Sequence, residues 1–364
     1  MKKDTNSTKP EEKSKTLDND KISQDDIKYI QENLKKTAKH DLKEFKKRQK
    51  KAELDEKKKK KEEEKIKRQK EKEIALQEKE EELRQKKIKR IKLIIFIILC
   101  LIGCIIWSRY MSTSGLIVKE YPIKTSVMPK EYDGLKIVHF SDIHYGTIVH
   151  GGELENLVKK INDQHPDIVV FTGDLIDKTT MLSDEDINYI TNVLKDINPK
   201  IETIAVTGNH DYSNDYFKKI TDNLDWIVLD NKYEYVYYNS TYPIIFVGLE
   251  DYSSGKPDYK NAFSFLNEVE EQTYTIVLMH EPDQIKEIQD YKFDLVFAGH
   301  SMLGQVRLPF VGSVYRPYGA RKYYEEKYII DNTEMYINGG IGTNYIKHRF
   351  LNKPSINLYR FYIE

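Results

Sequence analysis

The chain has 364 residues, with 59 basic and 59 acidic side chains that give a formal net charge of zero. This balance hides two opposite halves: residues 1–92 carry 33 Lys and Arg against 22 Asp and Glu, a net charge of +11, whereas residues 93–364 carry a net charge of −11. The acidic half argues against nucleic acid as a partner, because it would repel a polyanion. Both cysteines, Cys100 and Cys104, lie in an apolar segment, so a disulfide framework is excluded in the region that follows this segment.

Residues 1–24 are polar and rich in Lys, Asp, Ser and Thr, and we expect a disordered tail there. Apolar residues three or four apart then predict one face of a helix: Ile27, Ile30, Leu34, Ala38, Leu42 and Phe45. The apolar face does not continue through Glu56–Glu73, because this stretch contains a single aliphatic residue, Ile66. We therefore predict a charged helical region over residues 25–90, in which Glu and Lys pair four apart, without the apolar repeat that a coiled coil requires.

This charged region has two interpretations. It is a solvated spacer, which its composition favours, or a basic arm that touches anionic lipid or a protein partner. In the second case the chain is a membrane-tethered scaffold, and deletion of residues 1–80 would separate this role from any chemistry farther along.

The uncharged run Leu93–Trp107 follows. It reaches membrane-spanning length when Ile91, Ser108 and Tyr110 are added and Lys92 extends its amine to the surface, so we predict a transmembrane helix over residues 91–110. Basic residues crowd its N-terminal flank, while only one is close on the other side: Arg84, Lys86, Lys87, Lys89, Arg90 and Lys92 against Arg109. The positive-inside rule predicts a single-pass protein of the cell membrane, with a cytoplasmic N-terminus and an extracellular region after residue 111.

In the outer region, short runs of β-branched and other apolar residues recur, and we expect strands covered on both faces: 136–141, 167–173, 203–208, 243–249, 274–280 and 294–299. Helices are expected between several of them, at 152–163, 184–197 and 257–272. Strands that alternate with helices predict a layered α/β domain.

Five of these strands end in side chains that can bind a metal ion: Asp142 and His144 in SDIH, Asp174 in TGDLID, Asn209 and His210 in TGNHD, His280 in LMH, and His300 in AGH. Each motif alone also fits an ordinary turn, but ligand sites of open α/β sheets gather outside the carboxyl ends of the strands. Oxygen and nitrogen donors without a thiolate suit Mn, Fe or Zn. One carboxylate can bridge two such ions about 3.5–4 Å apart, a spacing used for phosphoryl displacement.

Residues 116–364 resemble a calcineurin-like metallophosphoesterase, in particular the bacterial membrane-attached branch of that superfamily. The motifs that carry the resemblance occur in order: HFSDIHYG, FTGDLID, VTGNHDY, MHEPD, GHSMLGQVRLP and GGIGTNYIKHRF. The resemblance implies a four-layer α-β-β-α sandwich with a centre of two divalent metal ions, the first of which binds more weakly in this chain if a ligand is missing. It further implies that the domain hydrolyses a phosphate ester at the outer membrane surface through a metal-activated water.

The same resemblance implies roles for single residues. Asp142 and His144 would bind the first metal, Asp174 would bridge, and the second metal would take Asn209, His280 and His300. His210 would lie near the leaving group and supply a proton, oriented by Asp211.

Two neighbouring positions depart from the family pattern. The family has Gly-His-x-His-Gly-Gly-Gln, whereas this chain has Met302 at the second His and Leu303 at the next Gly. A thioether is a poor partner for Mn or Zn, so the first metal would keep three protein ligands, still a workable catalytic number.

The chain is therefore expected to be a metal-dependent phosphoric ester hydrolase, or else a degenerate member that binds a phosphorylated envelope component with little turnover. The substrate classes left open are a phosphorylated small molecule, a lipid and a cell-wall compound. The membrane is an expected partner, and nucleic acid is not. Nearby basic residues would contact a substrate phosphate or balance surface acids: Arg307, Lys347, His348 and Arg349.

Overall fold

The computed structural model describes residues 23–267 and 273–364, so the tail expected over residues 1–24 lies almost wholly outside the described part. The chain divides into two compact units, Met1–Ile95 and Phe96–Glu364.

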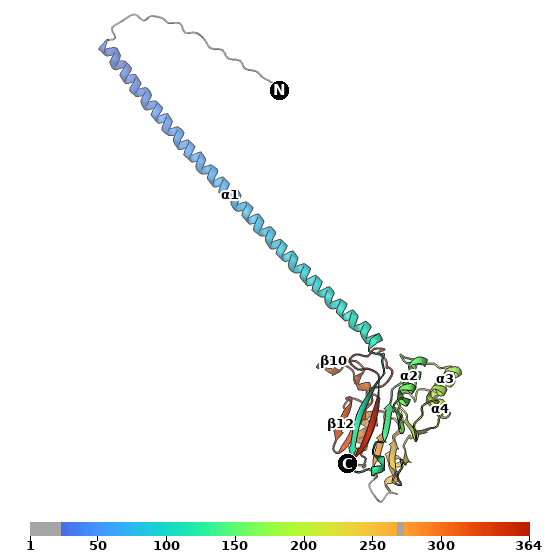
Figure 1. The fold of residues 1–364 in the computed structure, drawn as a ribbon. Helices are drawn as coiled ribbons and strands as arrows, with labels where there is room; N and C mark the ends of the chain where they lie inside the picture. Colours follow the sequence, from blue (N-terminus) through green and yellow to red (C-terminus); the bar gives the residue numbers. More distant parts are fainter. Residues whose placement is uncertain (1–22, 268–272) are drawn as a thin grey trace. The chain divides into compact units, whose positions relative to one another are not determined.

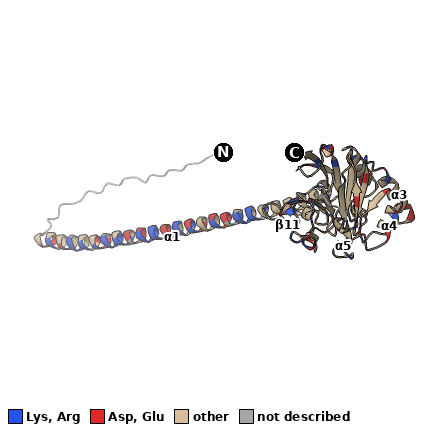
Figure 2. Ribbon diagram, turned by 90° about the horizontal axis from the view of Figure 1, so that it is seen from below, with Lys and Arg blue, Asp and Glu red and all other residues tan. Residues whose placement is uncertain are grey.

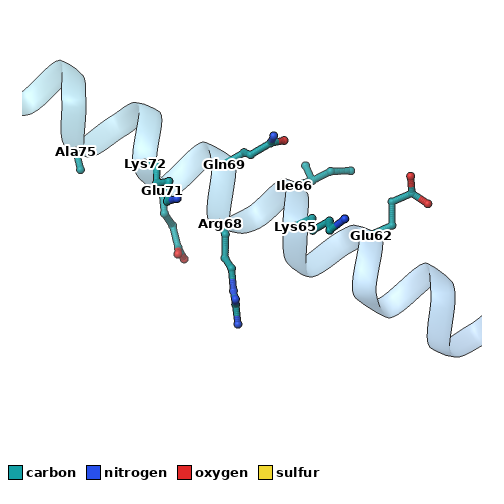
Figure 3. A pocket seen from close by; sticks show the side chains of 8 residues that line it. All are labelled: Glu62, Lys65, Ile66, Arg68, Gln69, Glu71, Lys72 and Ala75. Carbon is teal, nitrogen blue, oxygen red and sulfur yellow. The ribbon is translucent and has the colours of Figure 1, made fainter.

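Most of the long helix α1 (Gln24–Ile106) belongs to the first unit. Basic and acidic residues alternate along it (Figure 2), and none of its side chains is buried. Even the apolar residues near its start are exposed, such as Ile30 and Leu34. Side chains between Glu62 and Ala75 leave the helix in different directions (Figure 3), as expected of a solvated helix.

The last turns of α1 are apolar and belong to the second unit. The helix is long and apolar enough to cross a membrane, and it ends in a π-helical turn, η1 (Trp107–Met111). This turn packs on the folded domain: the Ser108 carbonyl accepts a hydrogen bond of 3.0 Å from the Arg349 amide, and the rings of Trp107 and Phe350 meet edge to face with centroids 5.5 Å apart.

Two six-stranded sheets form the body of the second unit (Figure 1). The first has the order β1-β14-β2-β3-β4-β5 and the second β12-β13-β9-β8-β7-β6. The first sheet's strands are β1 (Ile117–Thr125), β2 (Lys136–Phe140), β3 (Ile168–Thr172), β4 (Glu202–Val206), β5 (Trp226–Val228) and β14 (Ser355–Ile363). Those of the second are β6 (Lys232–Val236), β7 (Ile244–Gly248), β8 (Thr275–Leu278), β9 (Leu295–Ala298), β12 (Lys327–Ile330) and β13 (Thr333–Ile337).

Helices and turns complete the layers. The first sheet is covered by α2 (Gly151–Asn162), α3 (Asp184–Lys195) and α4 (Tyr216–Thr221). The second is covered by α5 (Tyr259–Ala262) with the 3-10 turns η3 (Ser264–Asn267) and η4 (Pro282–Glu287). The remaining elements are the hairpin β10 (Arg307–Leu308) and β11 (Gly312–Ser313) and the 3-10 turns η2 (Lys130–Tyr132) and η5 (Met302–Gly304).

Alternation along the strands explains three separate cores. In β2, Val138 and Phe140 pack toward the helices of the first layer, while Ile137 packs between the sheets. In β8, Ile276 faces the space between the sheets and Val277 the outer layer. Because both of their faces are buried, inner strands such as β3, β7 and β9 are nearly continuous apolar runs, which confirms the predicted layered α/β fold.

The helix predicted over 257–272 is shorter in the structure. Among the described residues of that stretch, α5 has one turn and η3 follows it, separated by Phe263, which is buried with Phe265 in the outer core. The sequence PDYKNAFSFLN thus makes two short turns that each insert aromatic rings, and residues 268–272 lie outside the described part.

The strands β2, β3, β4 and β5 are parallel, and so are β7, β8, β9 and β13. Their carboxyl ends deliver the residues singled out in the sequence.

Candidate metal centre

The loops at the strand ends have unusual backbone geometry. Asp142, His144, Asp174 and His300 all have positive φ, between 44° and 63°, which ordinary residues seldom adopt. Strain of this kind is concentrated at functional sites, where the surrounding structure holds it in place. A Cβ atom at Gly208 would collide with the Asp174 carboxylate, so a glycine is needed there.

Asp174, His280 and His300 form a tight group. Nε2 of His280 lies 3.2 Å from Oδ2 of Asp174 and 3.2 Å from Nδ1 of His300. The other ring nitrogens each face a backbone carbonyl: Nδ1 of His280 lies 2.6 Å from the Thr172 oxygen, and Nε2 of His300 lies 2.7 Å from the Tyr318 oxygen.

Those carbonyls fix the tautomers. A carbonyl oxygen only accepts, so each ring donates its N–H there. In the neutral rings, two nitrogen lone pairs then face each other beside a carboxylate. Such an arrangement of donor atoms fits a cation between the two rings. A carbonyl that accepts from the far nitrogen and orients the ring is typical of metal-binding histidines.

Asp142, His144 and Asp174 form a second group that shares Asp174 with the first. Nε2 of His144 lies 3.7 Å from Oδ1 of Asp142 and 3.5 Å from Oδ2 of Asp174. The buried oxygens Oδ1 of Asp142 and Oδ1 of Asn209 have no hydrogen-bond partner in the described structure. Because unpaired buried acceptors are costly, these oxygens also fit ligation of a cation.

Opposite charges hold the buried group together. Burial alone would raise the pKa of Asp174, but neighbouring His280 outweighs it and the pKa is lowered well below its usual range. Burial would likewise lower the pKa of His280, yet Asp174 raises it well above the ordinary value. A proton on His280 and a metal ion at its Nε2 are therefore alternatives, and metal binding here would release protons.

His210 lies on the other side of His144, with the ring centroids 4.5 Å apart. Its Nδ1 is 3.1 Å from the amide nitrogen of Lys178 and 3.3 Å from Oδ2 of Asp177. The sequence analysis predicted that Asp211 orients the His210 ring. In the structure, the Asp211 carboxylate instead accepts three backbone hydrogen bonds of 2.9 to 3.0 Å, listed by donor as Asp174, Leu175 and Gly208.

Asp211 thus ties two strand-end loops together, because its donors come from the loops after β3 and β4. Burial and then Asp174 raise the pKa of Asp211 to about 7. Asp177, rather than Asp211, is the carboxylate beside the imidazoles of His144 and His210. It is 4 % exposed, and its Oδ2 lies 3.6 Å from Nδ1 of His144. The sequence reasoning missed Asp177, although it is the last residue of TGDLID, three positions beyond Asp174.

Met302, which stands where the family pattern has its second His, is buried next to Asp142. It is 3 % exposed, and an added Cβ atom at Gly340 would lie within 3.2 Å of the Met302 Cε atom, the Arg349 Nη2 atom and the Asp142 Cβ atom. These three side chains therefore converge. Leu303, with φ of 51°, turns into the outer core.

Arg349 is fully buried, so it does not balance surface acids. Its Nε and Nη1 donate to the carbonyls of Gly342 and Gly339 at 2.9 and 2.8 Å, while Nη2 has no partner in the described structure. Arg307 is instead paired with Glu325, whose two carboxylate oxygens both accept from Nη2 of Arg307, at 2.9 and 2.7 Å. Of the basic residues considered from the sequence, Arg349 is the one whose unpaired nitrogen lies next to the buried aspartates and histidines at the strand ends.

Comparisons with known proteins agree with this geometry. The sequence profile of the calcineurin-like phosphoesterase family matches residues 135–303. The uncharacterized metallophosphoesterase YkuE of Bacillus subtilis is 31% identical over 256 residues, covering 70% of this chain and 88% of the relative. An uncharacterized metallophosphoesterase of Aquifex aeolicus is 28% identical over 262 residues, covering 68% and 92%.

A further relative is the UDP-2,3-diacylglucosamine pyrophosphatase LpxG of Chlamydia muridarum, 25% identical over 317 residues that cover 70% of this chain and 92% of that protein. The matched profile contains every strand end that contributes to the buried group of aspartates and histidines, from Asp142 to His300. With that profile and with YkuE covered over most of its length, the chain belongs to the calcineurin-like phosphoesterase family.

Proposed function

We propose that residues 116–364 form a metal-dependent phosphoesterase that hydrolyses a phosphate ester at the outer face of the cell membrane. The observation that carries the proposal is the pair of histidines whose Nδ1 and Nε2 atoms meet 3.2 Å apart beside Asp174, because this set of nitrogen and oxygen donors fits a metal ion that takes the place of the proton on His280. Residues 91–110 span the membrane in this proposal, and residues 25–90 lie in the cytoplasm.

The donor atoms suit two divalent ions such as Mn, Fe or Zn. Asp142 and His144 would hold the first, Asp174 would be shared, and Asn209, His280 and His300 would hold the second. When bound, such ions polarise a phosphoryl oxygen and make a nucleophile from water at neutral pH.

The protein's own residues supply the rest. His210 can give a proton from Nε2 to the leaving oxygen when its ring is the charged imidazolium, which the Asp177 carboxylate, 3.3 Å from Nδ1, stabilises. The substrate is a phosphorylated small molecule, lipid or cell-wall compound. The relative LpxG is a UDP-2,3-diacylglucosamine pyrophosphatase, and its acylated substrate is compatible with a membrane-proximal substrate here.

The experiment uses the full chain purified in detergent, with 4-nitrophenyl phosphate and bis(4-nitrophenyl) phosphate as monoester and diester and with Mn²⁺, Zn²⁺ or Fe²⁺ supplied in turn. We expect turnover that EDTA abolishes and that Asn209→Ala lowers about 100-fold, because a ligand with an unpaired buried oxygen is lost. Asn198→Ala, an exposed asparagine away from the strand ends, is the matched control. Equal rates for wild type and Asn209→Ala under every metal would reject the proposal.

A second candidate is favoured by Met302 and Arg349. A thioether replaces a ligand at the first site, and a buried guanidinium lies beside it, so the first ion would be bound weakly. In this case the chain binds a phosphorylated envelope component with little turnover.

A further inference from the structure

An apolar cavity of about 730 Å³ adjoins the candidate metal centre. Its volume is within the range of roughly 300–1,000 Å³ that ligand pockets have. His300 and Met302 are among its lining residues, so the cavity reaches the candidate metal centre at His300. Most of its other lining side chains are aliphatic or aromatic, which is unlike the surroundings that a small hydrophilic phosphate ester needs.

One wall of the cavity is the end of α1. Leu101, Cys104 and Ile105 line it, and all three belong to the apolar segment for which we propose a membrane span. This wall is fixed on the domain through Ser108, whose hydroxyl lies 3.0 Å from Nδ1 of His348. The cavity therefore joins two features that are otherwise separate, the membrane helix and the metal centre.

The opposite wall is the hairpin β10–β11. Leu308 and Val314 line the cavity, and both also remain exposed, at 45 % and 58 %. At the hairpin tip, Phe310 is fully exposed and Val311 is 66 % exposed. Figures 1 and 2 both show this hairpin beside the last turns of α1. An exposed apolar patch next to a membrane helix is suited to contact with lipid.

Tyrosines extend this patch. Tyr315 and Tyr345 line the cavity and are 61 % and 69 % exposed. Tyrosine is enriched at the boundary between membrane and water, because its ring is apolar and its hydroxyl is not. The cavity mouth thus has the composition of a membrane interface, while the cavity lining also includes the imidazole of His300.

We infer that the substrate is a lipid of the outer leaflet, whose acyl chain occupies this cavity while its phosphate ester lies beside His300. The inference rests on the proposed function and narrows its substrate class. In the hydrolysis, the oxygen of water forms a new bond to phosphorus, the bond from phosphorus to the leaving oxygen breaks, and that oxygen takes a proton. The acyl chain is unchanged and serves to hold the ester in place.

The test compares two chromogenic diesters with the same leaving group, 4-nitrophenyl hexadecyl phosphate and 4-nitrophenyl methyl phosphate. The full chain is reconstituted in lipid nanodiscs, and the readout is the ratio of kcat/KM for the hexadecyl ester to that for the methyl ester. Val314→Trp fills the cavity from the hairpin, and we expect this ratio to fall at least tenfold. Ile346→Asp, at an exposed lining residue, provides a second variant with the same expected loss.

Matched controls use Ile329, an apolar residue of β12 that is 69 % exposed and does not line the cavity. Ile329→Trp and Ile329→Asp should leave the ratio within twofold of wild type, which also accounts for partition of the long chain into the nanodisc. The inference is overturned if the cavity variants and the Ile329 variants have the same ratio.

A second measurement separates this inference from the proposed function. If neither diester is hydrolysed, phosphatidic acid with a diazirine in its acyl chain is cross-linked to the protein and the adducts are mapped. Adducts within residues 300–318 and 344–350 that Val314→Trp removes would support the lipid site even without turnover. Adducts confined to other segments, or unchanged in Val314→Trp, would overturn it.

Discussion

At the scale of single residues, Met302 stands where the family pattern has a histidine, so it bears on how tightly the proposed first metal would be held. Its side chain is buried beside Asp142, where a nitrogen donor would complete the set with His144. We expect Met302→His to tighten the weaker of two sites for Mn²⁺ by about tenfold or more, the low end of what ligand-shell changes produce. Metal titration followed by calorimetry, with elemental analysis of the purified chain, checks this.

The control for that substitution is Met302→Leu, which keeps an apolar side chain of similar size and should leave the metal content as in wild type. A histidine variant with unchanged stoichiometry and affinity would show that Met302 does not limit the site. A large gain in turnover along with the gain in affinity would favour the candidate in which the wild-type chain mainly binds its ligand.

Asp177 is the residue that sequence reasoning passed over. It faces Nδ1 of both His144 and His210, at 3.6 and 3.3 Å. Burial would raise its pKa, but the neighbouring His210 ring and the hydrogen bonds donated by Thr179 lower it instead, so it is an anion at neutral pH. We expect Asp177→Asn to lower kcat about 10–100-fold with little change in KM, because it positions the imidazoles without touching the substrate.

Rescue distinguishes positioning from a general loss of structure. Asp177→Glu should recover part of the lost kcat, and metal content should remain near that of wild type in both variants. Asp163→Asn, at an exposed carboxylate after α2, serves as the control. Failure of the glutamate to recover any activity while the metal is retained would argue against a role for the negative charge.

At the scale of elements, the sequence predicts the strands that are apolar throughout, because burial on both faces leaves a clear pattern. The runs at 167–173 and 203–208 match β3 and β4 to within two residues at each end. The strands β1 and β14 were not predicted. They pair with each other in parallel over nine residues, and in β1 Glu120 and Lys124 are exposed while Ile123 is the one buried residue. Such an edge strand has no continuous apolar run to detect.

The central strand β2 has a polar residue inside the core, and this has a consequence for pH dependence. His139 is fully buried, with Nε2 2.8 Å from the Thr172 hydroxyl and its ring stacked on Phe297. Burial lowers its pKa from 6.5 to about 3. Below pH 6.5, His139 therefore binds a proton in the unfolded chain that it does not bind in the folded chain. The free energy of unfolding falls as the pH drops for this reason.

We expect the free energy of unfolding of the wild type to fall with decreasing pH, between pH 6 and 4, more steeply than that of His139→Gln. The difference approaches about 1.4 kcal/mol per pH unit, the value for one proton. Urea unfolding of the detergent-purified chain at several pH values measures it. His165→Asn, at an exposed histidine, should keep the wild-type slope. Parallel slopes for wild type and His139→Gln would contradict the expectation.

At the scale of the whole molecule, the sequence predicts which residues meet but not how they are held. Parallel strands with adjacent carboxyl ends are enough to bring Asp142, Asp174 and His280 together. The carbonyls behind His280 and His300, and the buried Arg349, come from loops whose path depends on tertiary packing. No local pattern in the sequence marks the Tyr318 carbonyl as the partner of His300.

The charge asymmetry of the chain leads to a last prediction, on its orientation. Six basic residues lie just before the apolar run and only Arg109 lies just after it, so moving the N-terminal arm outward would carry this charge across the membrane. In a background with Cys100 and Cys104 changed to Ala, single cysteines are placed by Ala52→Cys in α1 and Met181→Cys on the domain surface. Met181 is 87 % exposed, so its substitute is open to reagent. In intact cells, a membrane-impermeant maleimide should label Met181→Cys and spare Ala52→Cys until the cells are lysed. The reverse pattern would place the metal centre in the cytoplasm and remove the outer leaflet as the source of substrate.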